Sequence, residues 1–283
     1  MELRHTAPNA GRLSDILKNE MRLSTGLMNK LKWGDAIQVN GSPQRTNYPV
    51  QPGDVITVRL DEEAPEYPAE DGPLSILYED DHILVVDKPA GMLIHPSRSK
   101  NDGTLANFVF GHYVKTGQKS AFHPMTRLDR DTYGIVLLAK NAHVHTLLQD
   151  TQIEKIYHAL TLGGPEDHSG TIDAPIARKP LPSLLREISP EGKPSVTQYQ
   201  VLARENGLCK LALKPITGRT HQLRLHCCHM GFPILGDPQY HSEESRIRSQ
   251  ELGLTTQKLC AWQLQFSHPV TGQLLTLTSG MDV

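Results

Sequence analysis

The chain has 283 residues, of which 38% are hydrophobic and 21% are charged, and this balance is typical of a globular protein with a substantial core. Its formal net charge of −2 excludes a polybasic coat, although it leaves room for a local basic groove. No apolar stretch approaches the roughly 18 residues of a membrane span, and the first residues lack the apolar core of a signal peptide. We therefore expect a cytoplasmic protein that has no membrane partner. The four cysteines include no Cys-x-x-Cys pair, so we predict neither a disulfide framework nor a structural zinc site.

The first 60 residues have the pattern of a small basic module, with eight Lys or Arg against five Asp or Glu. Residues 12–32 show helical spacing of apolar side chains, and Ser14 and Ser24 are the expected helix starts. Asn40-Gly41 predicts a hairpin turn, and a turn and an alternating strand follow it. Residues 61–71, DEEAPEYPAED, contain six acidic residues and no basic one, which favours a linker.

Three stretches of this module, RLSDIL, LSTGLMNKLKWGDAIQVNG and YPVQPGDVI, resemble the small S-four-like RNA-binding domain shared with a small-subunit ribosomal protein. In that family the second helix and the hairpin form a basic face for structured RNA. The resemblance implies that phosphate groups are contacted by Arg22, Lys30, Lys32 and Arg45. A solvated surface is the alternative interpretation of these charges.

The rest of the chain alternates short apolar runs with turn residues, and strands mostly follow one another. We predict an α+β fold with a mixed, mainly antiparallel sheet flanked by helices. Strands are expected in 74–88, 134–140, 157–164, 194–205 and 208–217, helices in 104–114, 141–155 and 218–231, and a hairpin around Pro269 to Gly272.

The stretch TRLDRDTYGIVLLAK, residues 126–140, places two arginines and two aspartates beside an apolar run. One interpretation is a surface turn with weak ion pairs, which Asp131 or Thr132 caps. The other is an aspartate at the edge of a cleft, held ionised by a guanidinium as a nucleophile or base. Arg224 is a candidate partner, because it lies beside a helical stripe of Leu223, Cys227 and Met230, where an arginine needs a carboxylate.

Several ordered segments together resemble the RluA-type pseudouridine synthases, whose signature is close to His-Arg-Leu-Asp-x-Asp-Thr-Ser-Gly. They are TRLDRDTYG, KIYHAL and TGRTHQLRLHCCHMGFPILGDPQY, preceded by ILYEDDHILVVDKPAGMLIHP and followed by FSHPVTGQ. The resemblance covers about residues 72–280, and an S-four-like domain is a common partner in that family. It implies an RNA-binding domain in 1–60, an acidic linker in 61–71 and a catalytic domain with the pseudouridine synthase fold in 72–283.

Carried over to this sequence, the resemblance makes Asp129 the catalytic aspartate, which Arg224 keeps charged and oriented. Tyr157 would pack against the target uracil, and Arg127 would fill the gap that the uridine leaves in the RNA. The isomerisation of uridine involves no redox change, so no cofactor is expected. Structured RNA is the expected partner, with large-subunit ribosomal RNA preferred over transfer RNA because the appended domain suits a large folded substrate. We assume a monomer.

Three positions depart from the family pattern: Thr126 stands where His is usual, Tyr133 where Ser is usual, and Cys260 where His is frequent. Tyr133 would either point outward or narrow the pocket. These departures keep open the alternative of an RNA-binding or ribosome-assembly factor with a decayed catalytic domain.

A metal site is a further alternative, because potential ligands cluster in one segment, at His221, His226, Cys227, Cys228 and His229. On one helix only His226 and His229 share a face, so we predict no metal.

Overall fold

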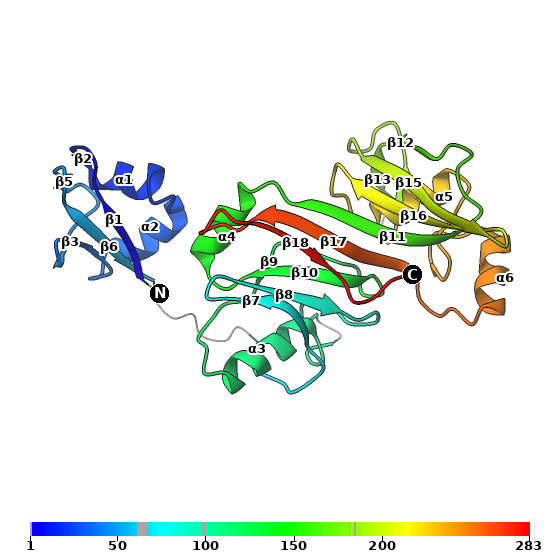
Figure 1. The fold of residues 1–283 in the computed structure, drawn as a ribbon, viewed down its shortest axis with the longest axis horizontal. Coiled ribbons are helices and arrows are strands. Elements are labelled where there is room, and N and C mark those ends of the chain that lie inside the picture. Colours follow the sequence, from blue (N-terminus) through cyan, green and yellow to red (C-terminus); the bar gives the residue numbers. More distant parts are fainter. Residues whose placement is uncertain (1, 61–66, 98–99, 181, 184) are drawn as a thin grey trace.

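The computed structural model describes residues 2–60, 67–97, 100–180, 182–183 and 185–283. The N-terminal module, residues 2–60, combines two helices with a four-stranded antiparallel sheet in the order β1-β6-β3-β4 (Figure 1). A short additional antiparallel pair joins β2 with β5. The bounds are β1 Glu2–Thr6, β2 Gly11–Arg12, α1 Leu13–Asn19, α2 Thr25–Leu31, β3 Ile37–Val39, β4 Ser42–Pro43, β5 Pro49–Val50 and β6 Val55–Arg59.

Local sequence explains much of this module. The side chain of Ser24 accepts a hydrogen bond from the N–H of Leu27 at 3.2 Å and so caps α2 as expected. Asn40 and Gly41 both have positive φ, 50° and 78°, as the predicted tight hairpin turn requires. The helix start expected at Ser14 is wrong: α1 begins at Leu13, and the Ser14 hydroxyl bonds the Asp15 side chain instead of a backbone amide.

The C-terminal part is built on a ten-stranded sheet in the order β12-β15-β16-β11-β17-β10-β8-β7, with β9 paired to β10 and β18 to β17 (Figure 1). Among its described pairings only β10 with β17 is parallel, so the predicted mixed, mainly antiparallel sheet is confirmed. The strands are β7 Ser75–Glu79, β8 Ile83–Lys88, β9 His123–Pro124, β10 Tyr133–Ala139, β11 Glu154–Leu162, β12 Ser169–Asp173, β15 Val196–Glu205, β16 Leu208–Pro215, β17 Leu259–Ser267 and β18 Leu274–Thr278.

Helices cover both faces of this sheet, and a separate pair, β13 Ile176–Arg178 with β14 Arg186–Ile188, lies near α5. Alternate residues of β10 belong to different cores, since Val136 packs with α3 and Ile135 packs with α4. All seven residues of β10 are therefore buried, which explains its unbroken apolar sequence. The helices are α3 Leu105–Lys115, α4 Ala142–Gln149, α5 Gln222–His229 and α6 Glu243–Glu251.

The one parallel contact depends on Gly134, which has a φ of 107° and pairs with Ala261. A Cβ at this position would lie 2.3 Å from the Ala261 carbonyl oxygen, so a side chain cannot be accommodated without moving β10 from β17. The glycine of the TRLDRDTYG segment therefore fixes where the preceding charged turn sits on the sheet.

Two expected elements differ from the structure. The helix predicted over 141–155 ends at Gln149, because Glu154 and the residues after it pair as β11 with β17. Met230 does not join Leu223 and Cys227 in the core and is 46% exposed, since α5 ends at His229 and Gly231, with a φ of 84°, turns the chain away.

The acidic linker expected over 61–71 lies only partly within the described residues. Residues 61–66 lie outside the described part of the chain. Glu70, however, is attached to the α3 region: its N–H donates to the Asn107 carbonyl at 3.0 Å, and its carboxylate accepts from the Gly103 N–H at 2.9 Å. Tyr67 packs on Phe110 with ring centroids 6.2 Å apart. Residues 67–71 are thus part of the C-terminal packing.

Candidate active site

A cavity of about 650 Å³ opens where the turn before β10, strand β11 and helix α5 meet. Asp129 comes from the turn, Tyr157 from the strand and Arg224 from the helix, and all three line the cavity. Arg127 also lines it and is exposed, and its guanidinium has no hydrogen bond to a described residue. The four residues singled out from the sequence therefore meet at one place, although three separate segments supply them.

Arg224 is the centre of a charged network. Its Nη1 donates to Asp129 Oδ2 at 2.9 Å, and its Nε and Nη2 donate to the two carboxylate oxygens of Asp237 at 2.7 and 2.8 Å. Nη2 also donates to Gln239 Oε1 at 3.0 Å. The sequence suggested the pairing with Asp129, but nothing in it identified Asp237 as the second and wholly buried partner.

The two carboxylates hold the guanidinium in different ways. Asp237 binds it in a forked geometry and itself accepts from the backbone N–H groups of Gln239 and Tyr240, so the arginine has a single orientation. Burial alone would lower the pKa of Arg224, but Asp237 and then Asp129 outweigh burial and raise it. The site thus contains a permanent cation whose third nitrogen is directed at Asp129.

Tyr157 supplies a flat, neutral ring. It is half-buried in β11, and burial, followed by the negative charge of Asp129, raises the pKa of its phenol far above the physiological range. The register between β11 and β17 shifts here: Ile156 pairs with Gln263 and Tyr157 with Ala261, so the extra residue, Trp262, lies on β17 and β11 itself stays regular.

Lys155 is a cavity residue that the sequence reasoning missed. It stands two positions before Tyr157 in the same strand, and this spacing places both side chains on one face. Burial lowers the pKa of Lys155, and no described residue forms an ion pair with it. A cation of this kind next to a carboxylate site is suited to binding a phosphate of the substrate.

His221 also faces Asp129, and in the sequence it stood out as one member of a histidine- and cysteine-rich segment. It adopts a left-handed conformation with a φ of 59°, which is uncommon outside glycine, and its Nε2 lies 3.8 Å from Asp129 Oδ2. Its Nδ1 lies 3.0 Å from the Tyr240 hydroxyl, whose oxygen accepts the Arg186 N–H. The Tyr240 proton is therefore available to Nδ1, which favours a ring with its own proton on Nε2, toward Asp129. Burial lowers the pKa of His221, in keeping with a neutral ring.

Lys88 binds the backbone of the charged turn. This side chain is fully buried, and its Nζ donates to the carbonyls of Pro89, Met92 and Arg130 at 3.0, 2.9 and 3.0 Å. Burial lowers the pKa of Lys88 to about 8, against the opposing effect of Asp131 and Asp129. Lys88 lies in the DKPAG segment, whose sequence alone gave no sign of this contact.

The departures from the family pattern have structural roles away from the cavity. Thr126 is buried, and its hydroxyl accepts the N–H of Leu137 at 3.1 Å, which ties the turn to β10. Tyr133 does not line the cavity; its hydroxyl donates to the Asp282 carbonyl at 3.1 Å. Cys260 lies beside the same tail, and its thiol donates to the Met281 carbonyl at 3.4 Å. Tyr133 therefore does not narrow the pocket.

The expected phosphate-binding residues of the N-terminal module divide into two groups. Lys32 and Arg45 both lie over the ring of Trp33, at 5.3 and 4.7 Å from its centroid. Arg22 instead forms an ion pair with Asp150 at 2.9 Å, across to the end of α4, and Lys30 lines a small hollow against residues 141–143. The structure thus brings only two of the four together.

Two of the possible metal ligands of α5, His226 and Cys227, have other surroundings in the fold. His226 uses Nδ1 with the Thr197 hydroxyl at 2.9 Å and Nε2 with the Ala174 carbonyl at 3.0 Å, while Cys227 is buried in the core. Among the described residues no group of three or more His, Cys, Asp or Glu side chains is placed to hold a metal ion. Nor does any helix in this part of the chain have the length and apolarity to cross a membrane.

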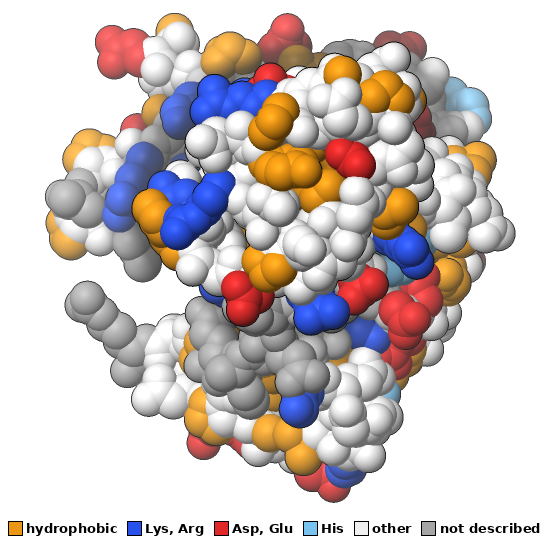
Figure 2. Space-filling view, turned by 90° about the vertical axis from the view of Figure 1, so that its left-hand side faces the viewer, with side chains coloured by type: hydrophobic (Ala, Val, Ile, Leu, Met, Phe, Trp, Pro, Cys, Tyr) orange, Lys and Arg blue, Asp and Glu red, His pale blue; other side chains and the backbone are white. Residues whose placement is uncertain are grey.

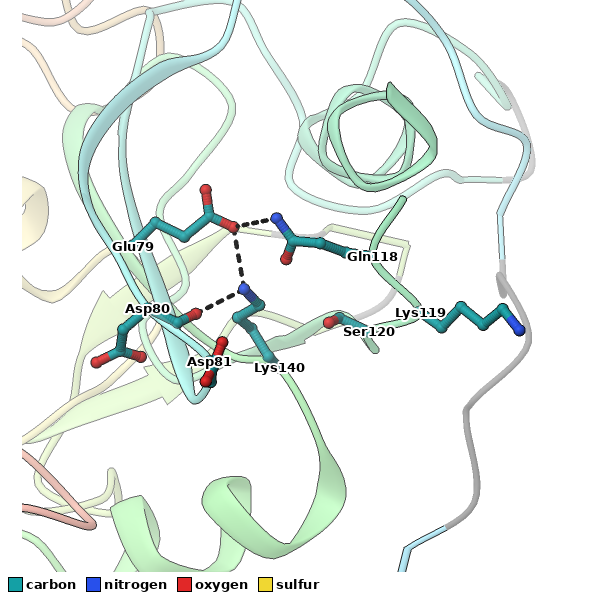
Figure 3. A pocket seen from close by; sticks show the side chains of 7 residues that line it. All are labelled: Glu79, Asp80, Asp81, Gln118, Lys119, Ser120 and Lys140. Carbon is teal, nitrogen blue, oxygen red and sulfur yellow. Dashed lines mark hydrogen bonds and ion pairs between the residues drawn. The ribbon is translucent and has the colours of Figure 1, made fainter. Parts of the chain in front are cut away.

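A second hollow, of about 430 Å³, lies between the β7–β8 turn and the segment after α3 (Figure 3). Lys140 is paired within it, because its Nζ donates to Glu79 Oε1 at 3.0 Å and to the Asp80 carbonyl at 2.6 Å. Burial would raise the pKa of Glu79, but Lys140, Gln118 and His112 lower it below its usual value. These contacts hold the walls of the hollow together. The cavity that contains Asp129 is therefore the better candidate for an active site.

A carboxylate held by a buried arginine, in a cavity that an aromatic ring also lines, is an arrangement suited to acid–base or nucleophilic chemistry on a flat substrate. Residues 82–229 match the RNA pseudouridylate synthase family. An uncharacterised RNA pseudouridine synthase of Bacillus subtilis is 37% identical over 89% of this chain and 89% of its own length. The ribosomal large subunit pseudouridine synthase D of Pseudomonas aeruginosa is 37% identical over 83% of this chain and 77% of its own.

Solved structures agree with these sequence relatives. Human RNA pseudouridylate synthase domain containing 1 superposes with a TM-score of 0.62 at 27% identity, covering 76% of this chain and 86% of that one. The chain belongs to the RNA pseudouridylate synthase family, and it is an isomerase that converts uridine in RNA to pseudouridine.

Proposed function

We propose that this enzyme modifies large-subunit ribosomal RNA and that Asp129 is its catalytic carboxylate. Relatives named as ribosomal large subunit pseudouridine synthase D, from Pseudomonas aeruginosa and Nitrosomonas europaea, support the choice of RNA. Transfer RNA is the alternative substrate. The observation that carries the assignment of Asp129 is its 2.9 Å hydrogen bond to Arg224 at the cavity wall, opposite an aromatic ring.

The reaction exchanges one bond for another within a single nucleotide. The bond from C1′ of the ribose to N1 of uracil breaks, and a bond from C1′ to C5 forms, after which C5 loses a proton to solvent and N1 carries one. The Asp129 carboxylate serves as nucleophile or base next to the sugar. Arg224 orients it through the 2.9 Å hydrogen bond from Nη1 to Asp129 Oδ2 and places a positive charge beside it.

The other cavity residues act on the RNA around this step. The target base must leave its stack, which costs a few kcal/mol. Stacking on the Tyr157 ring recovers roughly 1–3 kcal/mol of that cost. Arg127, exposed at the rim, occupies the space that the base vacates, and Lys155 holds a phosphate.

We also propose that residues 2–60 form a separate RNA-binding domain and that the catalytic domain begins by Tyr67. A hydrophobic cluster confined to the N-terminal module supports this division, as do the contacts of Glu70 with the α3 region. In this proposal the protein acts in the cytoplasm as a monomer.

The test is tritium release from transcripts of large-subunit ribosomal RNA and transfer RNA that carry uridine labelled at C5. Asp129→Asn removes the charge and is expected to abolish release. Asp131→Asn is the matched control, because Asp131 pairs with Arg130 and does not line the cavity. Release by wild type and by Asp131→Asn from ribosomal RNA alone supports the proposal. Release from transfer RNA alone would replace the substrate, and release by Asp129→Asn would remove Asp129 from the mechanism.

A further inference from the structure

Trp33 is the most exposed of the large hydrophobic residues in the described chain, with 71% of its surface accessible. It follows α2 in the N-terminal module and does not belong to the hydrophobic cluster of that module. The chain's other tryptophan, Trp262, has a structural role, since its ring stacks on His158 at a centroid distance of 4.2 Å. Packing therefore does not explain why an indole stands at position 33.

Two cations from different segments lie against this indole. Lys32 Nζ is 5.3 Å and Arg45 Cζ 4.7 Å from the ring centroid, both within the range of a cation–π interaction. Lys32 Nζ also donates to Asn29 Oδ1 at 3.2 Å, which limits its movement. The N-terminal module forms one end of the molecule. Figure 2 shows that Lys and Arg side chains gather beside hydrophobic side chains at this end.

This combination suits one kind of ligand. An unpaired nucleobase offers a flat π-face that stacks on indole, and the phosphates on either side of it pair with a lysine and an arginine. A perfect duplex offers phosphates but keeps its base faces stacked inside the helix. An aromatic surface flanked by cations therefore distinguishes unpaired from paired nucleotides, without a preference for one base.

We propose that Trp33, Lys32 and Arg45 form a platform on which one unpaired nucleobase of the RNA substrate stacks. This inference rests on the proposed function in taking RNA as the partner, and it extends recognition to a nucleotide other than the target uridine. The platform selects RNA in which a loop or bulge accompanies the helical part, and the catalytic cavity is not needed for this selection.

Fluorescence of Trp33 gives a direct readout. Trp262→Phe keeps an aromatic ring beside His158 and leaves Trp33 as the one tryptophan of the chain. This variant is titrated with an RNA stem-loop that has unpaired loop nucleotides, and with the same stem closed as a blunt duplex. Stacking predicts that the stem-loop quenches Trp33 emission and that the duplex does not. Equal quenching by both RNAs, or by neither, would overturn the proposal.

Affinity separates stacking from charge. Trp33→Ala is expected to weaken stem-loop binding by about 5- to 150-fold with little effect on the duplex, while Trp33→Phe restores most of the loss. Lys32→Gln and Arg45→Gln should weaken both RNAs and each lower the salt dependence by about 0.7 to 0.9 in log–log slope. Unchanged stem-loop affinity of Trp33→Ala would contradict the platform. Its melting temperature, compared with that of wild type, checks that the variant is folded.

Tritium release distinguishes a failure here from a failure of the proposed function. With ribosomal RNA, Trp33→Ala should raise KM and leave kcat unchanged, because Trp33 is remote in sequence from the cavity residues and does not line the cavity. If wild type modifies RNA and Trp33→Ala binds and reacts equally well, only the platform is wrong. If wild type releases no tritium although the stem-loop quenches Trp33, the platform stands and the proposed function fails.

Discussion

Arg224→Lys is the perturbation that most directly tests the charged network. Wild-type Arg224 donates four hydrogen bonds, one to Asp129, two to Asp237 and one to Gln239, and its side chain is only 5% exposed. Lysine keeps the positive charge but has one nitrogen in place of three. That nitrogen cannot reach both carboxylates with the geometry of a planar fork.

The expected magnitudes follow from these contacts. Loss of two charge-assisted hydrogen bonds in a buried network should cost about 3–5 kcal/mol of unfolding free energy. For a domain of this size, that corresponds to a fall in melting temperature of about 6–20 °C. Loss of the bond to Asp129, at about 1.5–3 kcal/mol, should lower kcat by about 10- to 150-fold if it is fully expressed in the transition state.

Scanning calorimetry and tritium release at saturating RNA would measure the two effects. Arg248→Lys is the matched control, since this partly exposed arginine of α6 pairs with Glu251 at 2.9 Å and such surface pairs contribute about 0–1 kcal/mol. The reasoning would be refuted if Arg224→Lys melted within 2 °C of the control and kept its kcat. Loss of stability with full kcat would restrict the role of Arg224 to holding Asp237.

Three further predictions concern residues around this network. Tyr157→Phe should keep kcat within about threefold, whereas Tyr157→Ala should lose about 5- to 150-fold in tritium release because the stacking surface is gone; equal loss in both would assign a role to the hydroxyl. Tyr133→Phe removes the donor to the Asp282 carbonyl and should cost about 1 kcal/mol in calorimetry with unchanged kcat, and a large change in kcat would contradict its position outside the cavity. Burial lowers the pKa of Lys88 from 10.5 to about 8. The Lys88 ammonium group of the unfolded chain therefore keeps its proton to a higher pH than that of the folded chain. Relative to Lys88→Met, the free energy of unfolding of wild type should therefore rise by up to about 3 kcal/mol between pH 8 and 10.5 in urea titrations, and a parallel pH dependence of the two proteins would contradict this burial effect.

Local sequence determined those features that depend on neighbouring residues. Ser24 caps α2 through an amide three residues away, and Asn40-Gly41 makes a turn whose positive φ angles few other pairs adopt. The unbroken apolar run of β10 indicated a buried strand, and all seven of its residues are buried. The family segments located Asp129, Tyr157 and Arg224 because each lies within a short recognisable string.

Only the tertiary structure decided which distant groups meet. Arg224 reaches Asp129 across 95 positions, and Tyr133 reaches Asp282 across 149, so no periodicity within a window could connect them. The parallel β10–β17 contact at Gly134 sets where the turn that carries Asp129 lies relative to β11 and α5.

The same limit explains the residues that the sequence did not reveal. Asp237 pairs with Arg224, and Lys88 binds the carbonyl group of Arg130. Both contacts exist because buried charges and buried carbonyl groups must be paired inside the fold. Trp33 differs, since it is noticeable through its exposure and its two cations, which become visible only when the chain is folded. The sequence thus determined the identity of the chemical groups, and the folded chain determined their distances, because long-range packing places them together.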